Sequence, residues 1–403
     1  MYPVHLTLIV FCIWLIGRKQ PDQWLYYLSF FLKISAGIAL GIIFKVFFGA
    51  GDTFAFYEAA QLITEGPFQE WWHMLGQSEI GPFPNQPRAI FFVKIVSGIL
   101  ILTKGNYWIV STYLSTVSFL AFWYLYRQVR TTLPNIKWPI VIGFLLLPSV
   151  VFWSAGIMKG ALTNASIAFL TAICLKLFYR KQMYWYEFVL VAIAGLLLYF
   201  IKYYLLIILL PAILYALFDR RAFKAGLTKP VRAIVYLAIL AGSIFIAPQI
   251  DPNLRVDRLP ESIHRNQQSL DNSERNNSQI DLMIEPTWGS LLAKTPKAIF
   301  IGLFGPTIFD TTSPWGWIPK IENLLIFGFT LWSIFLLFRQ KLFDPDILVI
   351  ASGFFILVLA AMLPLAAPNF GALVRYKAPL TPFLVTLVTI LPCWWIQKRR
   401  QNN

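Results

Sequence analysis

Long apolar runs separated by short polar segments are the feature that most constrains how this chain can fold. The runs are about 15 to 25 residues long, and an α-helix needs about 20 apolar residues to cross a bilayer. Strands of an outer-membrane barrel would instead give alternating segments of about 10 residues. Only 13% of the 403 residues are charged, against about a quarter in a typical soluble domain. The pattern therefore predicts an all-α, polytopic transmembrane helical protein.

The runs divide the chain into expected membrane helices and outer loops. Spanning segments are expected at 4–17, 24–48, 106–126, 138–155, 161–178, 186–201, 203–218, 232–249, 323–338, 346–366 and 380–396. Two shorter runs, 89–103 and 298–310, could each be a short span, a re-entrant piece or an interfacial helix. Together they predict about 11–13 spanning or re-entrant helices in a single integral membrane domain, residues 1–403.

Three further expectations concern the ends and loops of this domain. The first run lacks a basic segment before it and a small-residue cleavage site after it, so we expect a membrane helix and no cleaved signal peptide. Outer loop 51–88, rich in Pro and Trp, is expected to form interfacial helices. Outer loop 250–321 is expected to be partly flexible, because its first half is polar and nearly lacks aromatic residues.

Basic residues predict which side of the membrane each loop occupies. They gather in clusters at 127–137, 180–181, 220–232, 339–341 and 398–400. If the segments from 138–155 onward cross in turn, these clusters share one side, which the positive-inside rule assigns to the cytoplasm. The first outer loop reaches the opposite face only if 89–103 is re-entrant or interfacial. We therefore expect an integral protein of a bacterial inner membrane with an outward-facing site.

Acidic residues are few, and two of them follow the second run in the stretch GDTFAFYEAA: Asp52 and Glu58. They could solvate a helix end, or Asp52 could cap the next helix, since Asp is a favoured N-cap residue. However, the same predicted face carries four bases in short turns, against the positive-inside trend: Lys159, Lys202, Arg375 and Lys377. Ionisable residues beside membrane helices are default functional candidates, and both Lys and Arg suit phosphate.

One acid and several bases at a membrane surface favour a lipid-linked phosphate substrate and an acceptor that loses a proton. In glycosyl transfer from a lipid phosphate, the phosphate leaves, and a nearby Lys or Arg stabilises the charge that grows on it. A carboxylate can deprotonate or orient the acceptor hydroxyl, directly or through a divalent cation. Asp52 is therefore predicted as the base, and the four lysine and arginine residues as ligands of the phosphate.

Three stretches carry a resemblance to a known family. GDTFAFYEAAQLI resembles the first outer loop of the GT-C glycosyltransferases, where an acid after an early span is followed by a Tyr and a small-residue helix. LPSVVFWSAGIMKGALTNA resembles a helix–turn–helix of GT-C-like and polysaccharide-assembly membrane proteins, and RYKAPLTPFL resembles a late basic stretch of the same group. The resemblance implies a GT-C-like fold and transfer of a sugar from a polyprenyl-phosphate carrier. It implies that Asp52 is catalytic and that Lys159 lies in the site.

The resemblance is incomplete, and some residues are open to two interpretations. The family often has an Asp-Glu or Asp-Asp pair, whereas Thr53 follows Asp52, so a divalent cation (Mg²⁺ or Mn²⁺) as cofactor stays open. Tyr57 and Glu58, in the same stretch, are predicted to contact substrate. Arg88 could bind phosphate or anchor at lipid headgroups.

Other polar and aromatic residues give weaker patterns. Glu70, His73 and Glu79 share the first outer loop, but their spacing matches no strong ligand pattern, so no metal site is predicted. Trp315 and Trp317 are expected in the interfacial aromatic belt, with sugar stacking as the alternative. Glu285 and Asp310 are plausible contacts of the acceptor. The three cysteines lie in apolar runs without CxxC spacing and are expected to be free thiols.

The expected partners are a lipid-linked sugar donor, a glycan or lipid acceptor and membrane lipids. No nucleic acid is expected despite the net charge of +15, because most of the bases lie in short loops beside the membrane. One alternative is a cell-envelope polysaccharide polymerase or ligase acting on a lipid-pyrophosphate-linked glycan. Another is a lipid or solute transporter, which would place ionisable residues within the spans and show repeat symmetry. No P-loop, HExxH or GxSxG motif supports ATP-driven transport or hydrolysis.

Overall fold

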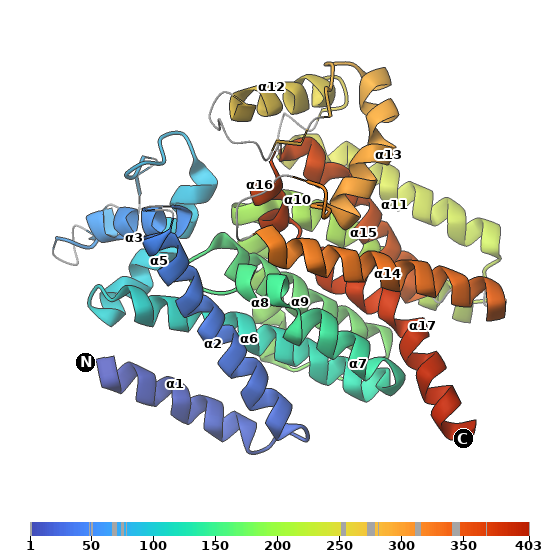
Figure 1. Ribbon diagram of the computed structural model, residues 1–403, viewed down its shortest axis with the longest axis horizontal. Helices are drawn as coiled ribbons and strands as arrows, with labels where there is room; N and C mark the ends of the chain where they lie inside the picture. Colours follow the sequence, from blue (N-terminus) through green and yellow to red (C-terminus); the bar gives the residue numbers. More distant parts are fainter. Residues whose placement is uncertain are drawn as a thin grey trace. The chain divides into compact units, whose positions relative to one another are not determined.

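The protein is built almost entirely of α-helices. The computed structural model describes residues 2–402 apart from 48, 50, 67–70, 74, 75, 78, 251–254, 272–278, 281, 311–315, 341–346 and 368. Within these residues there is no strand, only an isolated antiparallel bridge between Gln279 and Asn369 (Figure 1). The predicted all-α class is therefore confirmed. Parts of the outer loops 51–88 and 250–321, including Glu70 and Trp315, lie outside the described residues.

The helices follow the predicted apolar runs closely. They are α1 (Tyr2–Gly17), α2 (Gln23–Val46), α3 (Asp52–Leu62), α5 (Pro87–Thr103), α6 (Tyr107–Thr132), α7 (Lys137–Ile140), α8 (Pro148–Trp153), α9 (Lys159–Phe178), α10 (Trp185–Lys224), α11 (Lys229–Ile250), α12 (Leu259–Asp271), α13 (Trp288–Phe304), α14 (Trp317–Gln340), α15 (Ile347–Ala366), α16 (Phe370–Tyr376) and α17 (Thr381–Asn402). A 3-10 turn (Pro134–Ile136) precedes α7, and a π-helical segment, η2 (Val141–Leu146), follows it.

Six of these helices are long and apolar enough to cross a membrane: α2, α6, α9, α10, α14 and α15. A seventh span results if α16 and α17, bent by 71° at their junction, are counted as one broken span. Fewer full spans are found in the described part of the chain than the sequence predicts. Helices α1, α5 and α13 have 16 or 17 residues, which gives about 24 to 26 Å at 1.5 Å per residue, short of the roughly 30 Å hydrocarbon core. The chain is nonetheless a polytopic helical membrane protein.

The predicted span 138–155 is wrong as a single helix. The chain passes through α7 and the π-helical segment, and then Leu147 takes an extended conformation with φ −64° and ψ 118°. Proline disfavours the helical conformation in the residue before it, and Pro148 follows Leu147 directly. The helix therefore stops and restarts as α8, whose end leads into the turn that carries Lys159.

The predicted turn at Lys202 is a single non-helical residue inside α10. Lys202 has φ −147° and ψ 68°, and helical backbone continues on both sides of it. The two predicted segments 186–201 and 203–218 therefore meet at a kink. No proline lies at this point, since the only one within α10 is Pro211.

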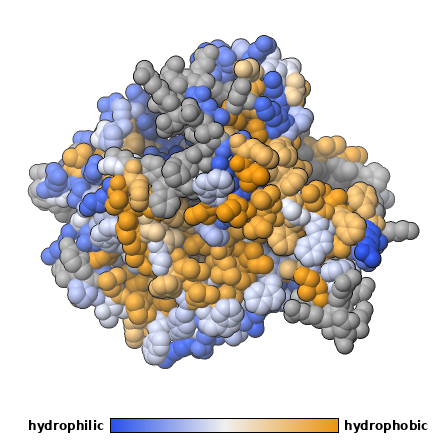
Figure 2. Space-filling model, viewed as in Figure 1, coloured by the Kyte–Doolittle hydropathy of each residue, from blue (hydrophilic) through white to orange (hydrophobic). Residues whose placement is uncertain are grey.

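The chain forms two compact units. The first contains Met1–Arg127, Val150–Ile173 and Tyr184–Tyr203, and the second contains Gln128–Ser149, Cys174–Met183 and Tyr204–Asn403. In the second unit α13 packs so closely on α15 that a Cβ on Gly302 would lie 2.0 Å from the carbonyl oxygen of Ala360. Figure 2 shows broad apolar areas on the surface, and many large apolar side chains of α1, α10 and α14 are exposed, as lipid-facing helices require.

Candidate functional site

The start of helix α3 determines where Asp52 lies. Gly51, just before it, has φ +157°, and a Cβ at this position would lie 2.3 Å from Cδ1 of Phe44 in α2. Only glycine therefore allows the chain to pass so close to the Phe44 ring. Asp52 is the first residue of α3 and is exposed. A carboxylate in the first helical turn interacts favourably with the positive end of the helix dipole.

Helix α3 is fixed in the first unit by hydroxyl bonds and ring stacking. The Thr53 hydroxyl lies 2.7 Å from the Tyr107 hydroxyl, and the hydroxyl of Tyr57 donates to the carbonyl oxygen of Gly105 at 2.7 Å. Phe54 stacks on Tyr107 with ring centroids 4.6 Å apart. Tyr57 is thus half-buried and bonded within the protein, whereas Glu58 points to the exposed side of α3.

A tight turn between α8 and α9 positions Lys159. Gly156 has φ +70°, and its N–H donates to the hydroxyl of Ser115 at 2.9 Å. A Cβ on Gly160 would lie 2.3 Å from the carbonyl oxygen of Trp153, so the turn tolerates no side chain there. Lys159 is the first residue of α9 and is half-buried. Its charge therefore adds to the partial positive charge of a 20-residue helix N-terminus.

Asp52 and Lys159 lie near the same face of α3. The Nζ atom of Lys159 is 5.0 Å from the ring centroid of Phe56. Phe56 is four residues after Asp52, and residues four apart in a helix have Cβ atoms about 5–6 Å apart on one face. The ammonium group of Lys159 therefore packs against the side chain that lies one helical turn after Asp52.

Arg88 and Lys202 belong to the same unit. Cζ of Arg88, at the start of α5, lies 4.2 Å from the ring centroid of Tyr203, the residue that follows Lys202. The residue before Lys202, Ile201, is buried in one apolar cluster with Phe56 and with residues of α5 and the α8–α9 turn. This cluster thus links the elements that carry six of the predicted site residues: Asp52, Tyr57, Glu58, Arg88, Lys159 and Lys202.

The remaining two predicted residues, Arg375 and Lys377, belong to the second unit. Arg375 is half-buried near the end of α16, with its Cζ 5.2 Å from the ring centroid of Tyr376. Lys377 is 3% exposed and lies between α16 and α17.

All three donors of the Lys377 ammonium have acceptors within the protein. Nζ donates to the carbonyl oxygens of Leu303 and Gly305, both at 2.9 Å, and to Oδ1 of Asn323 at 3.1 Å. The end of α13, where the last carbonyl oxygens lack partners within the helix, is thereby joined to α14. The neighbouring Glu322, 8% exposed, attracts the ammonium electrostatically. This arrangement favours a structural role for Lys377 over the predicted contact with phosphate.

The weaker candidates stay separate from these residues. His73 and Glu79 are exposed, and no group of three His, Cys, Asp or Glu side chains in the described part of the chain could hold a metal ion. Asp310 accepts from the backbone N–H and the hydroxyl of Thr307, at 2.6 and 2.8 Å, within its own turn. Trp317 is 57% exposed with Nζ of Lys320 4.7 Å from its ring centroid, as an interfacial tryptophan would be.

Two buried charged residues in the described part of the first unit were not among the sequence-based candidates. Lys33 lies in the middle of the span α2 and is 3% exposed, and Glu187 at the start of α10 is 1% exposed. Glu187 accepts hydrogen bonds from the Tyr124 hydroxyl and from the backbone N–H of Tyr184. The sequence did carry a signal for Lys33, because it is a charged residue inside the apolar run 24–48. The burial of Glu187 depends on α6, which lies far from it along the chain.

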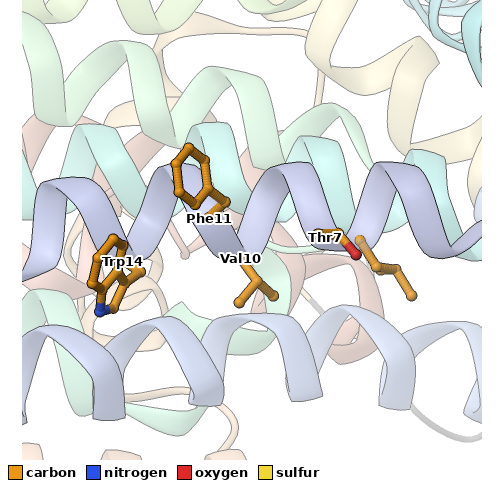
Figure 3. Close-up of a pocket in the computed structure, with 5 residues that line it drawn as sticks. Thr7, Val10, Phe11 and Trp14 are labelled. Carbon is orange, nitrogen blue, oxygen red and sulfur yellow. The ribbon is translucent and has the colours of Figure 1, made fainter.

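An open groove along α1 is lined by side chains of that helix: Leu6, Thr7, Val10, Phe11 and Trp14. Figure 3 shows Thr7, Val10, Phe11 and Trp14 along the helix. Nearly all of them are apolar, and none is a predicted site residue. The groove therefore suits contact with lipid chains.

Comparison with protein-family models, with curated proteins and with solved structures finds no match for this chain. The fold and its apolar surface define the class, an all-α polytopic integral membrane protein. Within that class, the residues around α3 are the constellation best suited to chemistry on an anionic substrate.

Proposed function

We propose that the protein is a membrane glycosyltransferase of GT-C type, which moves a sugar from a polyprenyl-phosphate carrier to an acceptor hydroxyl at the outer face. The proposal depends chiefly on one observation. An exposed acid, Asp52, begins α3, and Lys159 lies over Phe56 one turn further along the same helix. This pairing brings a proton acceptor and an anion ligand together from segments about 100 residues apart.

The reaction follows from this pairing. The acceptor oxygen forms a bond to the anomeric carbon as the bond between that carbon and the phosphate oxygen breaks. The electron pair of the broken bond stays on the lipid phosphate, and the acceptor proton passes to the Asp52 carboxylate. Lys159, with the N-terminus of α9, stabilises the charge that grows on the phosphate.

Other residues of the first unit extend the anion site. Lys202, at the kink of α10, and Arg88, stacked on Tyr203, supply further positive charge. Arginine can hold phosphate through two parallel N–H···O bonds, which a lysine cannot do. Arg375 belongs to the second unit, and no step of the proposed reaction depends on it. A divalent cation as cofactor remains part of the proposal only as a group that Asp52 could bind, and no step above depends on it.

Transfer assays with Asp52 and Lys159 variants test the proposal. The enzyme in membranes is supplied with a labelled polyprenyl-phosphate sugar, and formation of product and of free lipid phosphate is followed. Asp52→Asn is expected to lower the rate about 100- to 10,000-fold, as loss of a general base does. Lys159→Gln is expected to cost about 100-fold or more, as loss of one charge-stabilising group does.

Matched controls and outcomes separate the alternatives. Glu65→Gln and Lys104→Gln remove an exposed acid and an exposed base from neighbouring loops of the same unit and should leave transfer unchanged. Full activity of Asp52→Asn would refute the role of Asp52. If that variant also still moved a whole glycan from a lipid pyrophosphate while Lys159→Gln did not, the polymerase or ligase function would replace the one proposed here.

A further inference from the structure

A lysine is buried in the middle of a membrane span of the first unit. Lys33 lies on α2, and its Nζ donates to the hydroxyl of Ser154 at 2.5 Å. The same Nζ is 4.4 Å from the ring centroid of Phe122 in α6. The bond to Ser154 joins residues 121 positions apart in the sequence. Three elements therefore meet at one ammonium group: α2, α6 and the end of α8.

A lysine at this depth is costly. Moving a lysine ammonium into the hydrocarbon core of a bilayer carries a substantial free-energy penalty. A methionine would fill similar space with no such cost, and buried polar groups are best attested where they fix the register of packed elements. The partner of Lys33 is a neutral hydroxyl and a ring, so the contact specifies position without forming an ion pair.

The contacts next to Lys33 fix the same three elements at close range. One turn further along α2, the carbonyl oxygen of Gly37 accepts from the hydroxyl of Ser111 at 3.2 Å. A Cβ on Gly37 would lie 2.5 Å from Oγ of Ser115 and 3.2 Å from the backbone nitrogen of Gly156. Ser115 in turn accepts from the Gly156 N–H at 2.9 Å. Lys33 thus stands beside a close backbone approach between α2 and the α8–α9 turn.

Two of these elements lead directly to the two key residues of the proposed site. Helix α2 ends at Val46 and continues into Gly51 and Asp52. Ser154 precedes the glycine-containing turn that ends at Lys159. A shift of α2 along the turn would therefore change the separation of the Asp52 carboxylate from the Lys159 ammonium.

We infer that Lys33 is a positioning residue, which sets the separation of Asp52 and Lys159 through its hydrogen bond to Ser154. The inference rests on the proposed function for its consequence in catalysis. Its geometric part, the register of α2 against the α8–α9 turn, can be measured without any transfer activity.

The first test measures this register by cross-linking. The native cysteines Cys12, Cys174 and Cys393 are replaced, and cysteines are introduced as Asp52→Cys and Lys159→Cys in the full-length protein in its membrane. A short bifunctional thiol reagent should join these cysteines rapidly. Adding Lys33→Met should lower the rate of cross-linking at least severalfold, because the contact that fixes the register is lost.

Two further variants make the result specific. Ser154→Ala removes only the acceptor and should lower the cross-linking rate as Lys33→Met does. The double variant should be no slower than either single variant, because the two act through one contact. Lys45→Met removes an exposed lysine from the last turn of the same helix and should leave the rate unchanged. An unchanged rate in both Lys33→Met and Ser154→Ala would overturn the inference.

The second test links register to catalysis in the protein with Asp52 and Lys159 intact. Lys33→Met should lower kcat by roughly 10-fold or more while thermal stability in detergent stays near that of Lys45→Met, since a misplacement of about 1 Å can cost about 100-fold. If Lys33→Met fails to fold, Ser154→Ala carries the test alone. Slower cross-linking without a fall in kcat would support the role of Lys33 in fixing the register but would refute the proposed function. A lower kcat with unchanged cross-linking would refute the positioning role.

Discussion

Replacing Lys377 by methionine should destabilise the second unit severely. The substitution leaves three acceptors without their donor, namely the carbonyl oxygens of Leu303 and Gly305 and Oδ1 of Asn323. It also leaves the buried Glu322 carboxylate without the positive charge that attracts it. Two of the orphaned acceptors lie at the end of α13, where helical carbonyls already lack partners within the helix.

The magnitude follows from these contacts. Each buried acceptor left without a donor costs about 1–3 kcal/mol. Because the three acceptors share one ammonium group, their costs are not fully additive, and we expect a total loss of about 3–5 kcal/mol. The measurement is thermal unfolding of the purified protein in detergent, followed by the loss of helical circular dichroism.

Two comparisons make this prediction specific. Lys294→Met removes a partly exposed lysine from α13 and should cost much less stability than Lys377→Met. Adding Glu322→Gln to Lys377→Met should recover part of the loss, because the second change removes the unpaired charge. The reasoning is refuted if Lys377→Met unfolds at the wild-type temperature. A raised KM for the lipid-linked donor in that stable variant would restore Lys377 to the phosphate site.

Three further substitution experiments follow from the packing and the topology. Gly302→Ala places a Cβ 2.0 Å from a carbonyl oxygen of α15 and should cost about 1–3 kcal/mol in thermal unfolding, whereas Gly328→Ala, with no atom within 4 Å, should stabilise its helix by up to about 1 kcal/mol. Gly51→Ala should lower transfer activity more than stability, because it displaces the start of α3; equal activity would contradict this. In intact cells a membrane-impermeant maleimide should label Glu65→Cys but not Gln182→Cys, and the reverse pattern would place the proposed site in the cytoplasm.

Much of the helical layout could be predicted from apolar runs alone. The predicted span 346–366 corresponds to α15 almost residue for residue, and the predicted span 323–338 lies within α14, which begins at Trp317. The run 138–155 was misread because its hydropathy is continuous, although Pro148 already marks a conformational break at Leu147. Hydropathy therefore identifies what the membrane covers but does not show where a helix is interrupted within it.

The candidate site could be predicted only in part. The spacing of Asp52 and Lys159 on either side of apolar runs was enough to put them on one predicted face. The contact of Lys159 with Phe56, one turn after Asp52, depends on how α3 packs, which no local pattern shows. The burial of Lys377 depends on carbonyl oxygens of Leu303 and Gly305, more than 70 residues earlier. A base in a short outer turn therefore has the same sequence signature whether it faces a ligand or its own backbone.

The buried Lys33 has a consequence for how the protein is made. Helix α2 leaves the ribosome long before Ser154, its hydrogen-bond partner, which lies 121 residues later. At about 5 to 20 residues per second, the interval is roughly 6 to 24 s. During this time the ammonium group must be hydrated, by reaching toward the lipid headgroups or by remaining within the translocation channel. Full integration of the first strong membrane segment thus waits for a part of the chain that has not yet been synthesised.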